Sequence, residues 1–370
     1  MATYTHHLAE STGNREIVAL HSPDQRMPYP IEVHHRIRRD ERADYAHTAL
    51  ALTDCVDAVS IQHAFGIWGG DDGAYVLDFA RAQRLPVITT LHAVLRTPTE
   101  GQRAVLSELL NISDTTVVMS RSAAALVTAA YGVDPYRVAI VPHGVPDLPL
   151  IDPEAVKPRL GVEGRLVILS FGLLGPHKGL EEAIKAMPAV VAAHPTALYV
   201  IVGATHPEVR NRDGEALRAS LLEHIRRLGL KDHVQLVDRF VGRVELTRWL
   251  EAADVFLAPY ADADQMVSGT LSYAMGAGRA IVSTPFPAAA ELLADGRGLL
   301  VSPGSPARLA DALTRLLAAP AERAELGRLA YEHSRTMTWS AVGTEYGRLF
   351  ARLAGSPIRV APTVLAAVGA

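Results

Sequence analysis

Short apolar runs rich in β-branched residues recur along the chain, and helical stretches separate them. This alternation constrains the fold more than any other feature, because strands that are apolar throughout are typical of parallel sheets covered by helices on both faces. The runs fall into two series. The first comprises EIVAL, AVSIQH, PVITTLH, TTVVMS and VAIVPHG at 16–20, 58–63, 86–92, 115–120 and 138–144. The second comprises RLVILSFG, ALYVIVGA, VQLVDRF, DVFLAPY, RAIVSTP and GLLVSP at 165–172, 197–204, 234–240, 254–260, 279–285 and 298–303.

The two series predict two Rossmann-like, doubly wound α/β domains, which suits a chain of 370 residues. The Pro-rich segment 145–161 lies between the series and is expected to be the linker. We place the first domain at 1–150 and the second at 151–336. Residues 337–370 are expected to form a helix that packs back on the first domain, followed by a loose tail. Ligands of such sheets bind at the carboxyl ends of the strands, so a central cleft faced by both sheets is the expected site.

Composition argues against several classes of function. A formal net charge of -4 is not that of a nucleic-acid-binding protein. No apolar run reaches the roughly 18 residues of a membrane-spanning helix, and the N-terminus lacks the plan of a secretory signal. The one cysteine, Cys55, cannot form an intramolecular disulfide and is expected to be a small buried apolar residue. We expect a cytoplasmic protein; peripheral membrane contact and oligomeric state stay open.

The loop after the first strand of the second series has the residues of an anion site. In FGLLGPHKG, Gly172 and Gly175 let the backbone approach a bulky group, and Lys178 supplies a positive charge where a helix begins. A solvated loop lysine is the plain alternative. The loop is not the phosphate loop of NTPases.

A second helix start in the same domain has similar chemistry. Ser268, Gly269 and Thr270 follow strand DVFLAPY and its loop, and they offer two hydroxyls and an unobstructed amide at the helix N-terminus. Ordinary helix capping explains Ser and Thr alone. Two such starts in one domain, one of them with a lysine, suit a ligand that carries a diphosphate.

These elements resemble a known family. FGLLGPHKG, VGATHPE, ADVFLAPY, AMGAGRAIVST and ELLADGRGLLV in the second half resemble the donor domain of the retaining nucleotide-sugar glycosyltransferases of family 4. In the first half IQHAFGIWGG, ITTLHAVL, VVMSRSA and YRVAIVPHGV agree, so that the similarity extends over about residues 3–355. The resemblance implies the α/β fold named GT-B, and transfer of a hexose from a nucleotide diphosphate sugar to a hydroxyl of a glycan or other small acceptor.

The resemblance assigns roles in the donor site. Lys178 is expected to stabilise the diphosphate, with the loop at Gly172 and Gly175 and the helix start at Ser268–Thr270. The family's usual arginine is replaced by Leu173, and we expect His206 to act as a hydrogen-bond donor in its place. Gln265 stands where a glutamate usually contacts the sugar.

The nucleoside contact is expected at two other positions. Tyr273 replaces the second glutamate, which usually contacts the ribose, and Arg239 lies near the end of the strand candidate VQLVDRF. A tyrosine cannot hold a ribose as a bidentate carboxylate does, so the nucleoside must be bound in a different way.

In the first domain the resemblance places His92, at the end of PVITTLH, near the transferred sugar as a catalytic residue. His63, at the end of the neighbouring strand, is expected on the acceptor side with Gly69, Gly70 and Arg121. A structural histidine and a solvated helix cap are the alternatives for His63 and Arg121.

No cofactor is expected, because the resemblance gives the diphosphate to Lys178 and the helix ends. Asp262-Ala263-Asp264 has the spacing of a metal motif from glycosyltransferases of another fold, but it lies in a loop of a GT-B-like domain. We therefore expect no metal. The resemblance implies a reaction that needs no side-chain nucleophile. The site must then stabilise the negative charge that builds on the leaving phosphate.

The start of the chain departs from the family. MATYTHHLAE resembles the helix that follows the first strand and its glycine-rich loop, so the first sheet is expected to lack its first, central strand. Two other functions stay open. Leu173, Gln265 and Tyr273 favour a noncatalytic GT-B-like binding or partner subunit, and a sugar phosphorylase or epimerase shares the architecture.

Overall fold

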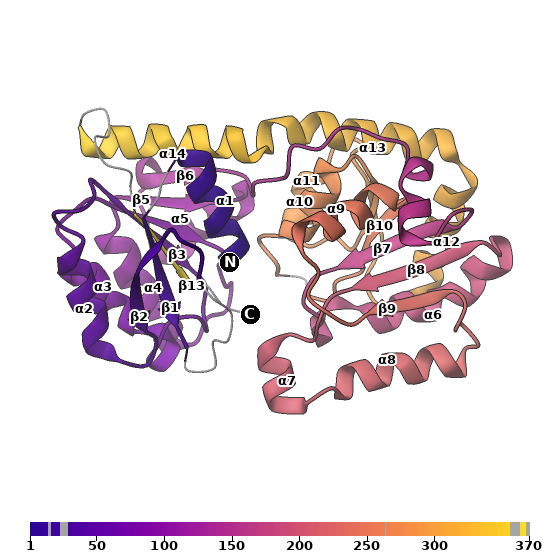
Figure 1. Cartoon of the computed structure of the whole chain (residues 1–370), viewed down its shortest axis with the longest axis horizontal. Helices are drawn as coiled ribbons and strands as arrows, with labels where there is room; N and C mark the ends of the chain where they lie inside the picture. Colours follow the sequence, from indigo (N-terminus) through magenta and orange to yellow (C-terminus); the bar gives the residue numbers. More distant parts are fainter. Residues whose placement is uncertain (14–15, 23–28, 263, 356–362, 368–370) are drawn as a thin grey trace. The chain divides into compact units, whose positions relative to one another are not determined.

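The computed structural model describes residues 1–370 except 14–15, 23–28, 263, 356–362 and 368–370. The chain forms two compact units. Residues 1–144 and 337–370 make the first, and residues 145–336 make the second. We call them the first and second domain (Figure 1).

The first domain alternates strands and helices, as its apolar runs predict. Among the described residues, seven parallel strands form one sheet in the order β2-β1-β13-β3-β4-β5-β6. The strands are β1 Ile17–His21, β2 Val33–Arg38, β3 Val59–His63, β4 Val87–Leu91, β5 Thr115–Val118, β6 Val138–Ile140 and β13 Thr363–Ala367. The helices are α1 Ala2–Thr12, α2 Arg42–Ala51, α3 Tyr75–Ala82, α4 Glu100–Ile112, α5 Arg121–Tyr131 and α14 Trp339–Ala354.

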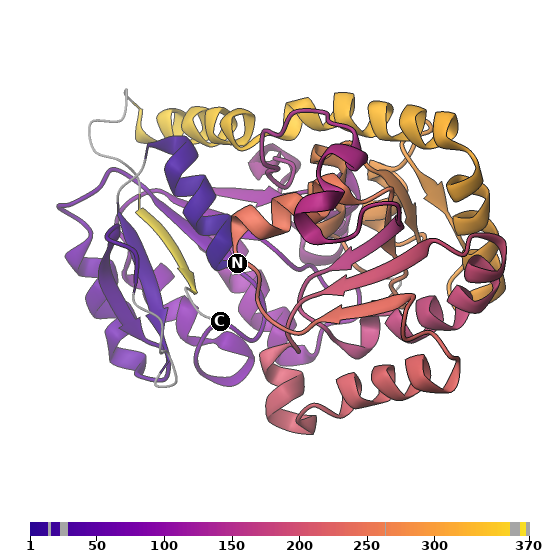
Figure 2. The same ribbon diagram turned by 45° about the vertical axis from the view of Figure 1, so that its right-hand side comes forward.

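Strand β13 comes from the end of the chain and lies in the middle of this sheet. It pairs in parallel with β1, where Leu365 lies opposite Val18, and with β3, where Leu365 lies opposite Ile61. Figure 2 shows it in yellow among the indigo and purple strands. The expectation of a loose tail is therefore wrong for 363–367, and the place of the expected missing strand is filled. If β13 is numbered as the first strand and the others follow in chain order, the sheet has the order 3-2-1-4-5-6-7, which is that of a doubly wound sheet.

Helices from the two ends of the chain pack together beside the sheet. The hydroxyl of Tyr4 on α1 lies 3.2 Å from that of Tyr346 on α14, which lies 2.7 Å from the hydroxyl of Thr90 on β4. A Cβ on Gly343 would lie 2.5 Å from the carbonyl oxygen of Ser11, so only glycine permits this approach. Helix α14 thus belongs to the first domain, on which it packs.

The second domain has the same winding. Its six described strands are parallel, in the order β12-β11-β10-β7-β8-β9. They are β7 Leu166–Phe171, β8 Ala197–Val202, β9 Val234–Val237, β10 Val255–Ala258, β11 Ala280–Ser283 and β12 Leu299–Leu300. The helices are α6 Leu180–Ala193, α7 Pro207–Asp213, α8 Ala216–Arg227, α9 Arg243–Ala252, α10 Gly269–Gly276, α11 Pro287–Leu292, α12 Pro306–Ala318 and α13 Pro320–Ser334.

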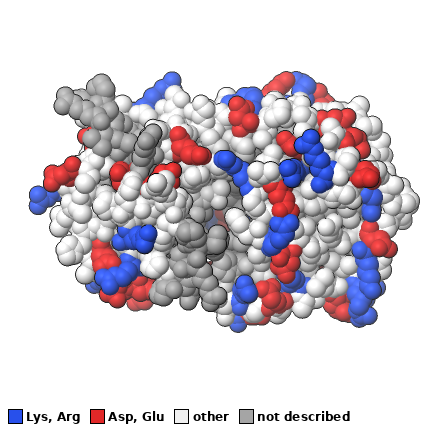
Figure 3. Space-filling model, in the orientation of Figure 1, with Lys and Arg blue, Asp and Glu red and all other residues white. Residues whose placement is uncertain are grey.

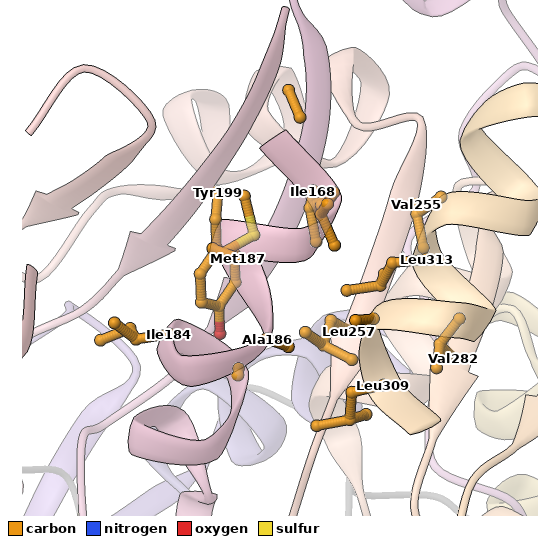
Figure 4. Packing of buried hydrophobic residues seen from close by; sticks show 14 of the residues in the cluster. Ile168, Ile184, Ala186, Met187, Tyr199, Val255, Leu257, Val282, Leu309 and Leu313 are labelled. Carbon is orange, nitrogen blue, oxygen red and sulfur yellow. The ribbon is translucent and has the colours of Figure 1, made fainter. Parts of the chain in front are cut away.

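Buried apolar side chains of this sheet and its helices form two clusters, one with Ile168 and Leu257 and the other with Val167, Leu169 and Phe256. Ile168 of β7 and Leu257 of β10 face Met187 of α6 and Leu313 of α12, and all four are buried (Figure 4). Tyr199 is buried with them, and its hydroxyl lies 2.9 Å from that of Ser170. The core supports β7, β8 and β10, whose carboxyl ends carry the candidate site.

The Pro-rich segment 145–161 is not a free linker. Buried Lys157 lies 2.8 Å from the Asp254 carboxylate, and Arg279 donates to the carbonyl of Ile151 at 3.0 Å. Tyr331 donates to the carbonyl of Leu148 at 2.8 Å. The segment therefore packs on the second domain, and the domain boundary lies at residue 144 rather than at the expected 150.

Charged side chains of both signs are interspersed on the face shown in Figure 3. Many are paired, as Arg328 is with Glu325 and Glu332. Cys55 is exposed, and its thiol donates to the carbonyl of Ala51, so the expectation that it is buried is wrong. In the part of the chain that the structure describes, no helix combines the length and the apolar character needed to cross a bilayer.

Candidate functional site

The loop that carries Lys178 is shaped by glycines. It leaves β7 at Gly172, whose φ of 122° is unfavourable for residues with a Cβ, and ends at Gly179, with φ 63°. A Cβ on Gly179 would lie 1.8 Å from the carbonyl oxygen of Pro259, just after β10. The loop therefore passes close to the end of β10, and helix α6 begins directly after it.

Lys178 lies over an aromatic ring. Its ammonium nitrogen is 4.1 Å from the centre of the Tyr260 ring. The Tyr260 hydroxyl in turn lies 2.6 Å from the hydroxyl of Thr270, at the start of α10. These contacts join the two sequence segments predicted to bind a diphosphate. The ring holds the ammonium without neutralising it, as a carboxylate would.

At the start of α10 one side chain caps the helix, and the first backbone amides of the helix remain to bind a ligand. Ser268 is the N-cap, and its hydroxyl accepts from the backbone amide of Leu271 at 3.3 Å. A Cβ on Gly172 would lie 3.2 Å from the Thr270 methyl, so the two segments are in contact. Capping thus accounts for the Ser268 hydroxyl, while Gly269 and Thr270 keep their backbone amides at the positive end of the helix.

Two histidines lie at the loop that carries Lys178, His177 within it and His206 in the loop after β8. His206 is the N-cap of α7: its Nδ1 accepts from the backbone amide of Glu208 at 3.3 Å, so in the neutral ring Nε2 carries the proton. The imidazole of His177 folds over Gly175, where a Cβ would lie 2.8 Å from its Cε1. Burial, then nearby Lys178, lowers the pKa of His177, and His206 acts in the same direction.

The two positions where the family has glutamates are engaged within the domain. The Gln265 side chain donates to the carbonyl of Val267 at 2.8 Å. Tyr273 is half-buried, and its ring centre is 6.4 Å from that of Phe171. Arg239 is exposed and forms a two-pronged ion pair with Glu245, with both distances 2.6 Å. A nucleoside would have to displace Glu245 to take both prongs of Arg239.

In the first domain, His92 and His63 lie at the ends of adjacent strands. His92 is half-buried, its Nε2 lies 2.8 Å from the side-chain oxygen of Gln62, and its ring meets that of Tyr4 edge-on at 4.7 Å. Burial, with help from the N-terminal amine and the imidazole of His143, holds the pKa of His92 well below its usual value. The imidazole is therefore neutral at neutral pH.

His63 is enclosed. Its side chain has no exposed surface, and neither ring nitrogen has a hydrogen-bond partner among the described residues. Its ring meets that of Phe65 edge-on at 5.1 Å, and burial lowers its pKa to about 4. An acceptor could reach this ring only after local rearrangement.

The glycines expected on the acceptor side have a packing role. A Cβ on Gly69 would lie 1.9 Å from the carbonyl oxygen of Arg39, and one on Gly70 would lie 2.6 Å from the Tyr75 ring. The Gly69 amide also donates to the Tyr45 hydroxyl at 3.0 Å. Arg121 is exposed in the first turn of α5.

The aspartates of the metal-like motif stabilise their own turn, in which the amide of Asp264 donates to the Asp262 carboxylate at 2.9 Å. Over the described ranges, no group of three or more His, Cys, Asp or Glu side chains is arranged to hold a metal ion.

Sequence reasoning missed Tyr260, His177, Tyr4 and Gln62. Tyr260 and His177 lie inside the predicted motifs, at the end of DVFLAPY and next to Lys178, so position alone could have indicated them. Gln62 likewise lies inside AVSIQH, next to His63. Tyr4 gave no such signal, because its contact with His92 joins helix α1 to the residue after β4.

Two doubly wound domains, the second with a lysine-bearing glycine loop beside a hydroxylated helix start, define the GT-B fold. Family profiles agree: "Glycosyl transferases group 1" matches residues 165–319, and "Glycosyltransferase Family 4" matches residues 1–147. The chain belongs to glycosyltransferase family 4.

Two relatives are named for inositol-containing substrates. The chain is 29% identical over 253 residues to D-inositol 3-phosphate glycosyltransferase 2 of Catenulispora acidiphila, an alignment covering 66% of this chain and 57% of that protein. It is 30% identical to the phosphatidyl-myo-inositol mannosyltransferase of Mycolicibacterium smegmatis, over 60% of this chain and 53% of that one. The chain thus spans little more than half the length of these relatives.

Solved structures share the fold. The Anabaena protein HepE in complex with UDP superposes with a TM-score of 0.69 at 18% identity, over 84% of this chain and 82% of that one. Sucrose-phosphate synthase from Thermosynechococcus elongatus gives a TM-score of 0.73 at 18% identity, over 95% and 92%.

Proposed function

We propose that the protein is a retaining glycosyltransferase that moves a hexose from a nucleotide diphosphate sugar to a hydroxyl of a glycan or other small acceptor. The observation that carries this proposal is the contact chain from Lys178 through the Tyr260 ring to Thr270. It brings a lysine and a helix N-terminus to one edge of the sheet, which suits a group with two phosphates.

The geometry suits stabilisation of a leaving group. When the bond between the anomeric carbon and the phosphate oxygen breaks, negative charge grows on the diphosphate. The Lys178 ammonium and the amides at the start of α10 are preorganised donors for that charge. The Nδ1 of His206 accepts from the Glu208 amide, which leaves Nε2 to donate, and we propose that this donor takes the role of the arginine that Leu173 replaces.

The donor and acceptor are proposed by class. Family membership and the fold shared with UDP-bound HepE support a nucleotide-sugar donor. Relatives named for inositol-containing substrates support a hydroxyl acceptor. Lysine and helix ends supply the positive charge, so we propose that the reaction needs no metal. A single cysteine fits a reducing compartment, which supports the cytoplasm as location.

Ligand-dependent thermal shift tests the proposal. UDP, GDP, UDP-glucose and GDP-mannose are added to the whole chain and to a Lys178→Met variant. We expect at least one of the four to raise the Tm of the wild type and to do so much less for Lys178→Met. Lys185→Met is the matched control, because Lys185 lies on α6 but pairs with Glu181 and Glu182 at the surface.

The other functions predict other outcomes. Stabilisation by inorganic phosphate or a glycan, without any nucleotide, indicates a phosphorylase. A wild type that none of these ligands stabilises indicates a noncatalytic subunit. Equal shifts in the wild type and Lys178→Met would overturn the assignment of Lys178 to the donor site.

A further inference from the structure

The lysine loop does not stand alone at the edge of the second sheet. It is bonded to the loop that follows β8. The Gly172 amide donates to the carbonyl of Val202 at 3.0 Å, and the Leu174 amide donates to that of Ala204 at 2.9 Å. The His206 amide then donates to the Leu174 carbonyl at 2.9 Å. Because the pairing continues past the ends of the strands, a shift of one loop displaces the other.

The two backbones touch at a pair of glycines. Gly203 has a φ of 148°, and a Cβ there would lie 2.0 Å from the carbonyl oxygen of Gly172. Such contact holds only while the Gly203 peptide keeps its orientation. Its amide donates to the Val237 carbonyl at 3.0 Å, and its carbonyl accepts from Arg218 Nη2 at 2.9 Å.

Arg218 approaches this peptide from helix α8 and is only 6% exposed. Its Nη2 also lies 2.7 Å from the Asp238 carboxylate, and its Nε lies 3.6 Å from that of Glu215. Glu215 in turn accepts a hydrogen bond of 2.5 Å from the hydroxyl of Thr205. One end of α8 thus holds Gly203 and Thr205, the residues on either side of Ala204.

Burial of a guanidinium costs free energy that an apolar side chain would not, and the cost is offset only by well-placed partners. Arg218 meets this cost incompletely, since Nε and Nη1 make no hydrogen bond to the residues that the structure describes. What Arg218 provides and an apolar side chain could not is the hydrogen bond that fixes the orientation of the Gly203 carbonyl.

We propose that Arg218, supported by Glu215, is a positioning residue for the donor site. It holds the 203–206 loop against the 172–179 loop, and thereby keeps His206 and Lys178 in place. Arg218 acts through the Gly203 peptide and does not touch the donor. The link from loop geometry to donor binding rests on the proposed function, whereas the link from Arg218 to loop geometry does not.

Hydrogen exchange tests the geometric link on the whole chain without ligand. Arg218→Met is expected to raise the exchange rates of the Leu174 and His206 amides at least tenfold, with β10 unchanged. Arg218→Lys, which retains a positively charged hydrogen-bond donor group, is expected to recover part of the protection. Arg226→Met is the control, because Arg226 lies on the same helix and pairs with Glu223 at the surface. Exchange at Leu174 and His206 equal to that of the control overturns the proposal.

Glu215→Ala keeps the proposal testable if Arg218→Met does not fold. Glu215 is half-exposed, so its removal spares the core. The same two amides should exchange faster, by a smaller factor. If they do not, the support assigned to Glu215 is wrong.

UDP binding and donor turnover test the functional link, with rates expressed per folded molecule. We expect Arg218→Met to weaken UDP binding at least tenfold and to lower kcat, and Arg218→Lys to restore part of both. Faster exchange with unchanged UDP affinity and kcat overturns the positioning role. If the wild type binds no nucleotide, the proposed function fails, and the exchange rates still decide whether Arg218 holds the loops.

Discussion

The ammonium of Lys178 lies 4.1 Å from the centre of the Tyr260 ring. A contact of this kind is worth about 0.5–2 kcal/mol. We expect Tyr260→Leu to weaken UDP binding about 3- to 30-fold, because Lys178 loses the surface that orients it. Tyr260→Phe keeps the ring and loses only the bond to Thr270, so its effect should be smaller. Isothermal titration with UDP distinguishes the two. Equal losses would show that the hydroxyl, rather than the ring, matters.

Gly179 and Gly229 offer a matched test of the lysine loop. Both have positive φ, 63° and 68°, but a Cβ would meet the Pro259 carbonyl at 1.8 Å in the first case and nothing within 4 Å in the second. Gly229→Ala should therefore cost only the backbone strain of about 1–2 kcal/mol. Gly179→Ala adds a steric clash and should cost more than about 3 kcal/mol. Urea unfolding measures both, and similar losses would contradict the close approach of the loop to β10.

His63 predicts a pH dependence of stability. Burial lowers its folded-state pKa to about 4, below the usual value of 6.5. Below pH 6.5 the unfolded chain therefore binds more protons than the folded chain. The stabilisation is present above pH 6.5 and is lost as the pH falls toward 4, by on the order of 2–3 kcal/mol.

His63→Leu removes this titration. Urea unfolding from pH 7 to pH 4.5 should show the free energy of unfolding falling more steeply for the wild type than for the variant. His143, whose pKa is also lowered, titrates alike in both proteins. The difference between the two profiles therefore reports on His63 and on its electrostatic effect on His92, whose pKa it helps to lower. If the free energy of unfolding falls equally with pH in the wild type and in His63→Leu, His63 is hydrated or paired, and its enclosed placement is contradicted.

Strand β13 predicts a large effect of one proline. Leu365 lies opposite both Val18 and Ile61, so a proline there removes an amide from the middle of the sheet. Leu365→Pro should destabilise the first domain by about 3 kcal/mol or more. Leu365→Ala keeps the amide and is the control. Hydrogen exchange in β1 and β3 is the measurement; equal protection in both variants would show that the strand does not occupy this position.

Local patterns predicted most strands and the glycine loop, since apolar runs and glycines express local requirements. Strand β2 was missed because only Val33 and Ile37 of its six residues are buried, among polar and basic neighbours. The position of β13 is set by pairing with residues far away in the chain, which no short window contains. The exposure of Cys55 likewise depends on how distant parts of the chain pack, whereas its apolar neighbours in the sequence indicated burial.

In the site, residue types were predictable and partners were not. Lys178 and Thr270 could be selected by their positions at helix starts, but their link through Tyr260 requires β7 and β10 to be adjacent. Arg218 gave no signal, because an arginine in a helical pattern is normally solvated. Its burial follows from the way α8 meets the loop after β8.

The central strand of the first domain also sets the order in which the molecule can fold during synthesis. Strand β3 leaves the ribosome about 300 residues before β13, which must insert beside it. The second domain is one continuous segment, 145–336, and can complete its sheet first. Until the last strand arrives, β1 and β3 keep unpaired edges of the kind that invite pairing with other chains. Newly made chains of this protein thus need protection from aggregation longest in the half that is translated first.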